Sequence, residues 1–326
     1  MDSLLDAVKK KKPPPPPPAR PETKSSTQSV PPNATVLSKR GLGWPWDQPE
    51  SHFQLFFPPN LPDTPRASQQ IAQSKVSWLL NWELWVPGGL PKSVEWVPCV
   101  RTASQVQDII PFLTDIRSKG TMVKHLLGFN EPEIASQANL SADQAARLWR
   151  DYLLTAKSQL CLRLGSPGMC SDTALCVPWL DEFFASFLPA ERDDVGNSLQ
   201  EGIAGSGVDF LVLHWYGSSV VEMIKFLETL HKRYGLPIWL NEFACSRMGA
   251  HDEESTATEV SDFLKQTIPW LDATPWIERY AYFGNAQGQD VGDWVGKTNN
   301  FIEHRRGADK TNGFALSDIG SLYLQL

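Results

Sequence analysis

Eight short apolar runs recur between residue 41 and residue 284, and stretches with a helical pattern separate most of them. Strand-like runs that alternate with amphipathic helices are typical of repeated βα units and a parallel sheet. Eight such strands close most simply into a (β/α)8 barrel, which needs about 250 residues. The runs are Gly41 to Trp46, Val76 to Glu83, Val94 to Arg101, His125 to Glu131, Leu162 to Pro167, Asp209 to Tyr216, Pro237 to Glu242 and Arg279 to Gly284.

The intervening stretches predict the outer helices of the barrel. They are Ser104 to Lys119, Ser141 to Ser158, Pro178 to Leu188, Ser219 to Tyr234 and Ser255 to Leu271. Ser141 and Ser219 are expected to be N-caps. The alternative is a doubly wound open sheet, which would need a glycine-rich phosphate turn after the first strand. Gly41-Leu42-Gly43-Trp44 does not continue into one, so the barrel is favoured.

The first 38 residues have a different composition. A lysine run, Lys9 to Lys12, leads into six prolines, Pro13 to Pro18, and then into Ser, Thr, Gln and Pro. This composition favours extended polyproline II and cannot bury a core. We expect a disordered arm at residues 1–38 and one catalytic domain at residues 39–326. A ligand for a proline-reading domain, or a basic anchor to an acidic surface, stays open as a role for the arm.

Charge and hydropathy exclude several classes of partner. The formal net charge is −7 and the pI is near 5.4, so the chain lacks the basic footprint that nucleic acid requires. No apolar run reaches the ~18 residues of a membrane-spanning helix. Thirteen tryptophans suit neutral sugars, whose apolar faces pack on indole rings. The N-terminus has no secretory signal pattern, which by itself indicates an intracellular product.

Cysteine spacing gives no sign of a metal site. The five cysteines form no CxxC pair, which argues against a zinc site or a disulfide framework. Cys99 and Cys161 are expected in the core, and only Cys170 and Cys176 have a spacing that a disulfide could close. No HExxH, GxSxG or GxxxxGK[ST] motif occurs, so metalloprotease, serine hydrolase and P-loop chemistry lack their residues. We expect no cofactor and no metal.

Two glutamates stand at the ends of strand-like runs. Glu131 ends the fourth run and Glu242 ends the seventh, and the carboxyl ends of barrel strands are where active sites form. Breaking a glycosidic bond requires two carboxyl groups across one sugar. The pair therefore predicts a glycosidase. Glu83 and Glu133, which also follow apolar runs, are interpreted as supporting or solvent-facing residues.

Other polar and aromatic residues at strand ends are candidates for substrate binding. Asn130 is placed to donate to a sugar 2-hydroxyl. His214 and Tyr216 share one side of the sixth strand, where Tyr216 is expected to hold the nucleophile and His214 to stabilise the charged site. The alternative for His214 is a core histidine with its hydrogen bonds satisfied. Sugar platforms or hydrogen-bonding subsites are expected at Trp44, Trp46, Asn81, Trp82, Tyr282, Phe283 and Trp294.

Four segments together resemble the alkali-sensitive-linkage-like glycosidases of glycoside hydrolase family 128. They are Lys39-Arg40-Gly41-Leu42-Gly43, Gly128-Phe129-Asn130-Glu131-Pro132, His214-Trp215-Tyr216 and Trp239-Leu240-Asn241-Glu242-Phe243. The resemblance implies a (β/α)8 barrel that hydrolyses β-1,3-glucan with retention, with Glu131 as acid/base and Glu242 as nucleophile. Many relatives act at cell walls, which would place the protein outside the cell.

The resemblance leaves three functions open. The first is a β-1,3-glucanase, with endo cleavage favoured over exo cleavage. The second is a protein that binds β-1,3-glucan oligosaccharides without cleaving them. The third is a cellulase or mannanase of the same clan. For the first we expect a monomer, carboxyl groups about 5 Å apart, and a raised pKa at Glu131 beside an ionised Glu242.

Overall fold

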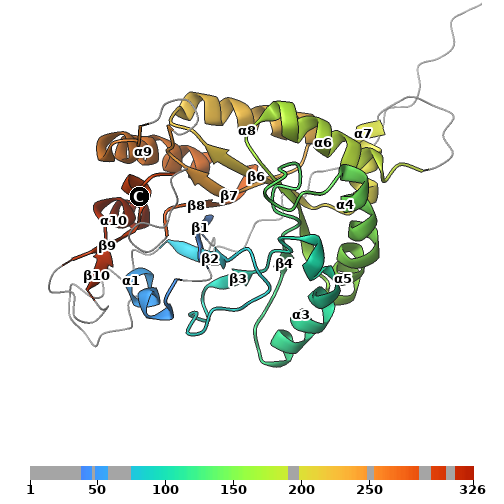
Figure 1. Ribbon diagram of the computed structural model, residues 1–326, viewed down its shortest axis with the longest axis horizontal. Helices are drawn as coiled ribbons and strands as arrows, with labels where there is room; N and C mark the ends of the chain where they lie inside the picture. Colours follow the sequence, from blue (N-terminus) through green and yellow to red (C-terminus); the bar gives the residue numbers. More distant parts are fainter. Residues whose placement is uncertain are drawn as a thin grey trace, which may run out of the picture. The chain divides into compact units, whose positions relative to one another are not determined.

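Eight parallel strands surrounded by helices form the core of the molecule (Figure 1), which confirms the predicted (β/α)8 barrel. The computed structural model describes residues 38–45, 48–57, 75–189, 198–247, 253–285, 295–305 and 313–326. The predicted arm therefore lies outside the described residues, except for Ser38. The barrel strands are β1 (Arg40–Gly43), β2 (Val76–Leu80), β3 (Glu95–Val97), β4 (His125–Leu126), β5 (Arg163–Met169), β6 (Phe210–Tyr216), β7 (Ile238–Ala244) and β8 (Ile277–Tyr282).

The strands close into a ring between β3 and β4. Their order is β3-β2-β1-β8-β7-β6-β5-β4, and a parallel bridge between Cys99 and Leu127 joins the two ends. The Leu127 amide donates to Pro98 O at 2.9 Å, and the Val100 amide donates to Leu127 O at 3.1 Å. Pro98 has no N–H for the ladder, which is why β3 is so short.

The helices form the outer layer that the amphipathic stretches predict. Ser141 and Ser219 cap α4 and α8, since their side chains accept from the amides of Gln144 and Glu222. The sequence pattern missed α7, α10 and the hairpin of β9 (Ile302–His304) and β10 (Phe314–Leu316). The helices are α1 (Phe53–Phe56), α3 (Ile109–Ser118), α4 (Ala142–Leu148), α5 (Leu154–Leu160), α6 (Thr173–Ala185), α7 (Ser198–Ser206), α8 (Val220–Tyr234), α9 (Ala257–Ala273) and α10 (Asp318–Gln325), with short turns η1 (Glu50–His52), η2 (Ala103–Asp108), η3 (Trp149–Leu153) and η4 (Lys297–Asn299).

Alternating side chains divide the hydrophobic residues into two cores. Trp78, Phe210 and Trp239 fill the barrel interior, and Phe210 stacks on Trp239 with ring centroids 4.1 Å apart. Leu42 and most other outward residues pack between the strands and the helices. A Cβ at Gly41 would lie 2.2 Å from the Trp78 indole. The first strand therefore has glycine at this inward-facing position, because any side chain there would collide with Trp78.

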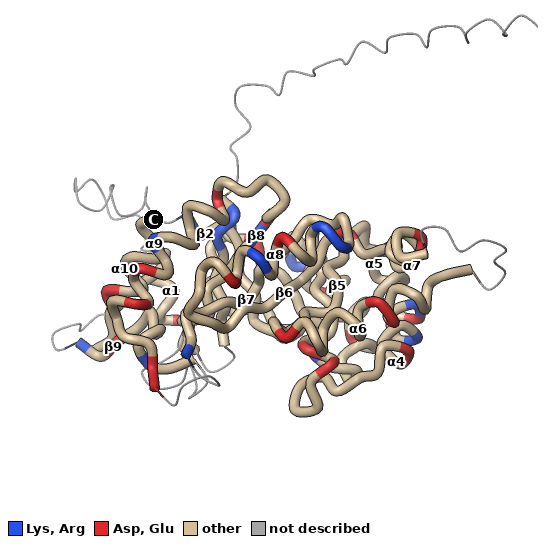
Figure 2. Tube along the Cα trace, turned by 90° about the horizontal axis from the view of Figure 1, so that it is seen from above, with Lys and Arg blue, Asp and Glu red and all other residues tan. Residues whose placement is uncertain are grey.

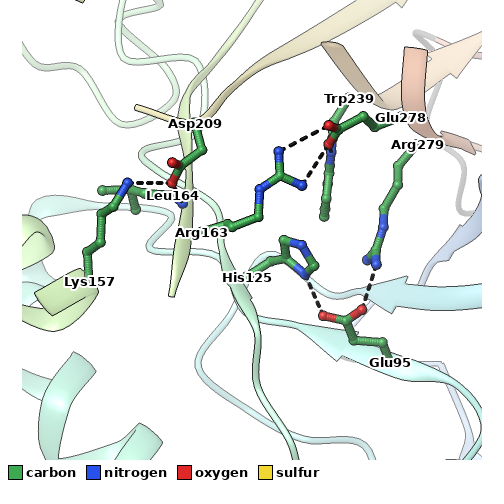
Figure 3. A network of polar contacts seen from close by, with 9 residues as sticks. All are labelled: Glu95, His125, Lys157, Arg163, Leu164, Asp209, Trp239, Glu278 and Arg279. Carbon is green, nitrogen blue, oxygen red and sulfur yellow. Dashed lines mark hydrogen bonds and ion pairs between the residues drawn. The ribbon is translucent and has the colours of Figure 1, made fainter. Parts of the chain in front are cut away.

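Charged residues close the barrel at the amino ends of the strands (Figure 3). Glu95 accepts hydrogen bonds from His125 and Arg279, each at 2.6 Å. Burial opposes ionisation of Glu95, but the hydrogen bond from His125 and the charge of Arg279 outweigh it and lower its pKa to about 2. The same network includes Lys157, Arg163, Leu164, Asp209, Trp239 and Glu278. Because this end is filled with paired charges, chemistry is left to the opposite end.

Acidic and basic residues are interspersed along the described trace (Figure 2). Within the ranges that the structure describes, no helix is both long and apolar enough to cross a membrane.

Candidate active site

Glu131 lies in a strained turn just beyond β4. Its φ of 43° is in the left-handed region, which non-glycine residues adopt at an energetic cost and most often at functional sites. Backbone hydrogen bonds hold the turn, from the Asn130 amide to Arg101 O at 3.0 Å and from the Glu131 amide to Gly168 O at 2.7 Å. The loop therefore fixes the direction of the Glu131 side chain from two neighbouring strands.

A β-bulge turns Glu242 toward the barrel axis. On β7, Leu240 pairs with Leu213 of β6, but the next residue of β6, His214, pairs with Glu242. Asn241 is the extra residue. Leu240 packs outward, so strict alternation would also place Glu242 outward. The bulge reverses this, which is a common use of bulges beside active sites.

His214 links the two carboxylates. It is fully buried, and its Nδ1 lies 2.7 Å from Glu131 Oε1. Its Nε2 lies 3.4 Å from Glu242 Oε1, which is an ion-pair distance, although no hydrogen bond forms there. Both carboxyl groups therefore contact one imidazole ring.

Two further donors fix Glu242. Tyr216 Oη donates to Glu242 Oε2 at 2.8 Å, which is the contact expected from the sequence. Trp82 Nε1 donates to Glu242 Oε1. Phe283 packs edge-on against Trp82 and Tyr216, with ring centroids 5.5 and 6.0 Å apart. Three aromatic side chains, one at the end of β6 and two just after β2 and β8, thus form a wall beside Glu242.

The pKa directions differ from the sequence expectation. Burial acts to raise the pKa of Glu131, but the hydrogen bond and charge of His214 outweigh it, so the net shift is downward. Burial raises the pKa of Glu242, and the charge of Glu131 adds to this against the opposing effect of His214. The expectation that the pKa of Glu131 is raised is therefore wrong.

His214 carries the proton in this site. Burial alone would lower its pKa, but the charges of Glu242 and Glu131 and the hydrogen bond to Glu131 raise it to about 9. At neutral pH the imidazole is therefore a cation between two carboxyl groups. A functional position, rather than an ordinary core position, fits a histidine in this environment.

Three predicted binding residues do not face the site. Trp44 is fully buried and stacks on Phe53 with centroids 3.9 Å apart, so it cannot serve as a sugar platform. Tyr282 is also fully buried, and its hydroxyl donates to Asn299. Both point outward from the barrel, into the layer under the helices. Asn81 is 1% exposed, and its amide atoms bond Trp85 O and Trp96 Nε1, so it supports a loop instead of binding substrate.

Three further predicted binding residues are Asn130, Trp46 and Trp294. Asn130 is 7% exposed, and its Nδ2 donates to Gln137 Oε1 at 3.4 Å. Trp46 and Trp294 lie outside the described residues. The sequence reasoning missed Gly168, where a Cβ would lie 2.9 Å from His214 Nε2. The predicted fifth strand ended one residue too early to include it.

The two glutamates set aside in the sequence analysis have supporting contacts. Glu83 pairs with Arg101 at 3.4 Å and accepts from Gln105 Nε2 at 2.6 Å. Glu133 Oε1 accepts from the Cys170 amide at 2.7 Å, while its Oε2 is buried without a hydrogen-bond partner in the described structure. Burial raises the pKa of Glu133.

The cysteines are all free. Cys99 and Cys176 are buried, whereas Cys161 is exposed, so its expected place in the core is wrong. Cys161 ends α5 with a φ of 49°, which places its side chain at a helix terminus rather than in a strand. Among the residues that the structure describes, no group of three or more His, Cys, Asp or Glu side chains is arranged to hold a metal ion.

Solved structures of glycoside hydrolases have the same barrel fold as this chain. An exo-β-1,3-glucanase of glycoside hydrolase family 128 from Aureobasidium namibiae aligns with a TM-score of 0.65 at 23% identity, over 89% of this chain and 97% of that one. An endo-β-1,3-glucanase of the same family from Sorangium cellulosum aligns with a TM-score of 0.62 at 25% identity, over 88% and 97% of the two chains. Enzymes with either cleavage mode therefore share this fold.

Sequence comparison gives the same result. Alkali-sensitive linkage protein 1 of Schizosaccharomyces pombe is 27% identical over 294 residues, which is 89% of this chain but 45% of that protein. The chain thus spans about half the length of this relative. The resemblance read from the four segments is confirmed. Residues 59–323 match the family described as glycosyl hydrolase catalytic core, and this chain therefore belongs to that family.

Proposed function

We propose that the protein is a retaining β-1,3-glucanase in which Glu131 is the acid/base and Glu242 is the nucleophile. The observation that carries this proposal is that both carboxyl groups contact opposite nitrogens of His214. The shared ring brings the two carboxyl groups close together, which supports a pair that acts on one glycosidic bond. The substrate class is taken from the solved relatives, which are β-1,3-glucanases.

The proposed reaction has two displacements. First, Glu131 gives its proton to the leaving oxygen while Glu242 attacks the anomeric carbon, the glycosidic bond breaks and a glycosyl ester forms. Second, Glu131 takes a proton from a water molecule whose oxygen attacks the same carbon, and Glu242 leaves as a carboxylate. Tyr216 and Trp82 donate to Glu242 and so hold it in the direction of attack.

His214 supplies the proton that the leaving oxygen takes up in the first step. In the free site the pKa of Glu131 is lowered, so the carboxyl group is not itself the store of the proton. The raised pKa of His214, about 9, makes this ring the proton donor, and its Nδ1 lies 2.7 Å from Glu131 Oε1. We propose that the proton moves across this hydrogen bond to Glu131 when a sugar fills the site and the leaving oxygen accepts it.

Incubation of the purified protein with laminarin, a β-1,3-glucan, followed by sizing of the products, tests this function. A ladder of oligosaccharides is expected, because endo cleavage is our proposal. Release of glucose alone would mean exo cleavage. Binding of laminari-oligosaccharides without any shortening would contradict hydrolysis and leave the binding-protein alternative. Carboxymethylcellulose and mannan serve as controls for the other β-glycanase activities.

A further inference from the structure

A pocket of about 620 Å³ lies at the carboxyl ends of β2 and β3, against the start of α3. No residue of the proposed reaction lines it. Its walls come from the loop after β2, from η2 and from the first turn of α3. The lining residues are Glu83, Leu84, Trp85, Gln105, Asp108, Pro111 and Phe112.

The pocket lies next to the chain segment that contacts Glu242. Trp82 donates to Glu242, and the next residue, Glu83, already lines the pocket. The φ of 58° at Trp82 turns the chain at this point. Cys99 beneath the site is affected by the charges of both Glu242 and Glu83, which together with burial raise its pKa. The pocket therefore lies on the Trp82 side of Glu242.

The lining suits a sugar ring. Trp85 is 36% exposed and is the most exposed tryptophan in the described parts of the chain. Its indole offers a flat apolar face to a hexose. Glu83 and Asp108 add carboxylate acceptors for hydroxyl groups, and the side chain of Asp108 makes no capping hydrogen bond at the start of α3. An apolar pocket wall with a few polar groups is the usual form of a small-ligand site.

The backbone at Trp85 is also held in place. The buried Asn81 donates to Trp85 O and accepts from Trp96 Nε1 at 3.2 Å. Trp96 in turn packs edge-on against Phe112, which lines the pocket, with centroids 6.1 Å apart. Asn81 is therefore a positioning residue for Trp85. A platform fixed before binding loses less entropy when the ligand arrives.

We propose that this pocket is an additional sugar-binding site, which takes a glucosyl unit of a β-1,3-glucan chain away from the bond that is cleaved. The unit stacks on Trp85, and its hydroxyl groups donate to Asp108 and Glu83. The inference rests on the proposed function, because it assumes that the glucan chain passes between Glu131 and Glu242. It predicts that the protein distinguishes long oligosaccharides from short ones.

Steady-state kinetics of Trp85→Ala on laminaritriose and laminarihexaose test the proposal. The KM for laminarihexaose should rise about three- to tenfold, the effect of one aromatic stacking contact, while kcat/KM for the shortest cleaved oligosaccharide stays unchanged. Trp85→Phe, which keeps a ring, should lose less. Trp276→Ala is the matched control, because Trp276 stacks on His231 at the amino end of β8, whereas the pocket lies at the carboxyl ends of the strands. This variant should leave the dependence on chain length intact.

A binding arm separates this inference from the hydrolase proposal. Titration of laminarihexaose into Glu242→Gln and into the double variant with Trp85→Ala needs no turnover. Weaker binding in the double variant supports the site even if the wild type never cleaves glucan. Equal binding of the two, or an equal loss on short and long substrates, overturns the site even if hydrolysis is confirmed. No binding of β-1,3-oligosaccharides at all overturns both proposals.

Discussion

Glu131 and Glu242 differ in what surrounds them. Glu242 receives two neutral donors, Tyr216 and Trp82, while Glu131 receives the charged ring of His214. Neutral donors fix the direction of a carboxylate and leave it free to attack, whereas a protonated partner can return a proton. The roles proposed for the two residues follow from this difference.

Replacement of Glu131 by Gln should depend on the leaving group. The variant cannot protonate the departing oxygen, so turnover of laminarin should fall by about 10²–10⁴-fold. A β-laminaribioside of a dinitrophenol leaves without a proton and should be cleaved far better. Initial rates on both substrates measure this. An equal loss on the two would mean that Glu131 is not the acid.

Replacement of Glu242 by Gln should abolish hydrolysis but keep binding, because the amide preserves the shape and cannot attack the anomeric carbon. Calorimetry with laminarihexaose measures the binding. Glu222→Gln, on the exposed first turn of α8, is a control that should keep wild-type turnover. If Glu242→Gln hydrolysed laminarin at the wild-type rate, Glu242 would have no part in the reaction.

The pH profile should report the proton on His214. Its pKa is raised to about 9 from an ordinary 6.5, so the charged ring stabilises the folded state below pH 6.5, and this contribution is lost as the pH rises through about 9. We expect kcat/KM to fall over the same upper range, because this ratio reports the free enzyme. A profile that falls already near pH 6.5 would contradict the ion-paired site.

At the scale of the strands, two glycines of β1 make room for two different indoles. A Cβ at Gly41 would lie 2.2 Å from Trp78 in the core, and one at Gly43 would lie 2.7 Å from Cη2 of Trp82. Gly41→Ala should therefore cost about 1–3 kcal/mol of unfolding free energy by overpacking. Gly43→Ala should chiefly lower kcat, because the displaced Trp82 loses its contact with Glu242.

Urea unfolding and laminarin turnover of the two variants separate these effects. Gly41→Ala should unfold at lower urea concentration with kcat near the wild type. Gly43→Ala should unfold near the wild-type midpoint with reduced kcat. The account of Trp82 would be wrong if Gly43→Ala kept full turnover.

Strand periodicity located the fold and the two carboxyl groups, but it did not settle which strand-end residues face inward. Trp44 and Tyr282 are predicted binding residues because they end strands, yet the outward side chain of Leu42 implies an outward Trp44 two residues later. Glu242 is the opposite case. Alternation from Leu240 would have placed it outward, and the bulge at Asn241 is not visible in the residue pattern.

The pKa order could not be read from the sequence either. It depends on which carboxyl group is nearer to each nitrogen of His214, at 2.7 Å and 3.4 Å. Those distances follow from the turn at Glu131 and the bulge in β7, which are tertiary features. The sequence named the three residues but not their order of ionisation.

At the scale of the whole molecule, the barrel separates stability from chemistry. The amino ends of the strands carry the ion pairs around Glu95 (Figure 3), and the carboxyl ends carry Glu131 and Glu242. Changes at one end should therefore alter unfolding, and changes at the other end should alter turnover.

Acid unfolding of a Glu95→Gln variant tests the structural end. The folded-state pKa of Glu95 is about 2 and its ordinary value is 4.5, so its contribution is present above pH 4.5 and is lost as the pH falls toward 2. The variant leaves Arg279 and His125 without their partner and should lose about 3–5 kcal/mol. Its unfolding free energy should also change less steeply between those pH values. Asp143→Asn breaks an exposed pair with Arg147 and should cost about 1 kcal/mol or less.

The central claim is that Glu131 and Glu242 cleave β-1,3-glucan by two displacements, and the anomeric configuration of the first product tests it most directly. Proton NMR during hydrolysis of laminarihexaose, recorded before mutarotation, distinguishes the α and β forms of the newly formed reducing ends. The account predicts that the β form appears first and that the α form follows only by mutarotation. Initial release of the α form would mean inversion and would contradict Glu242 as the nucleophile.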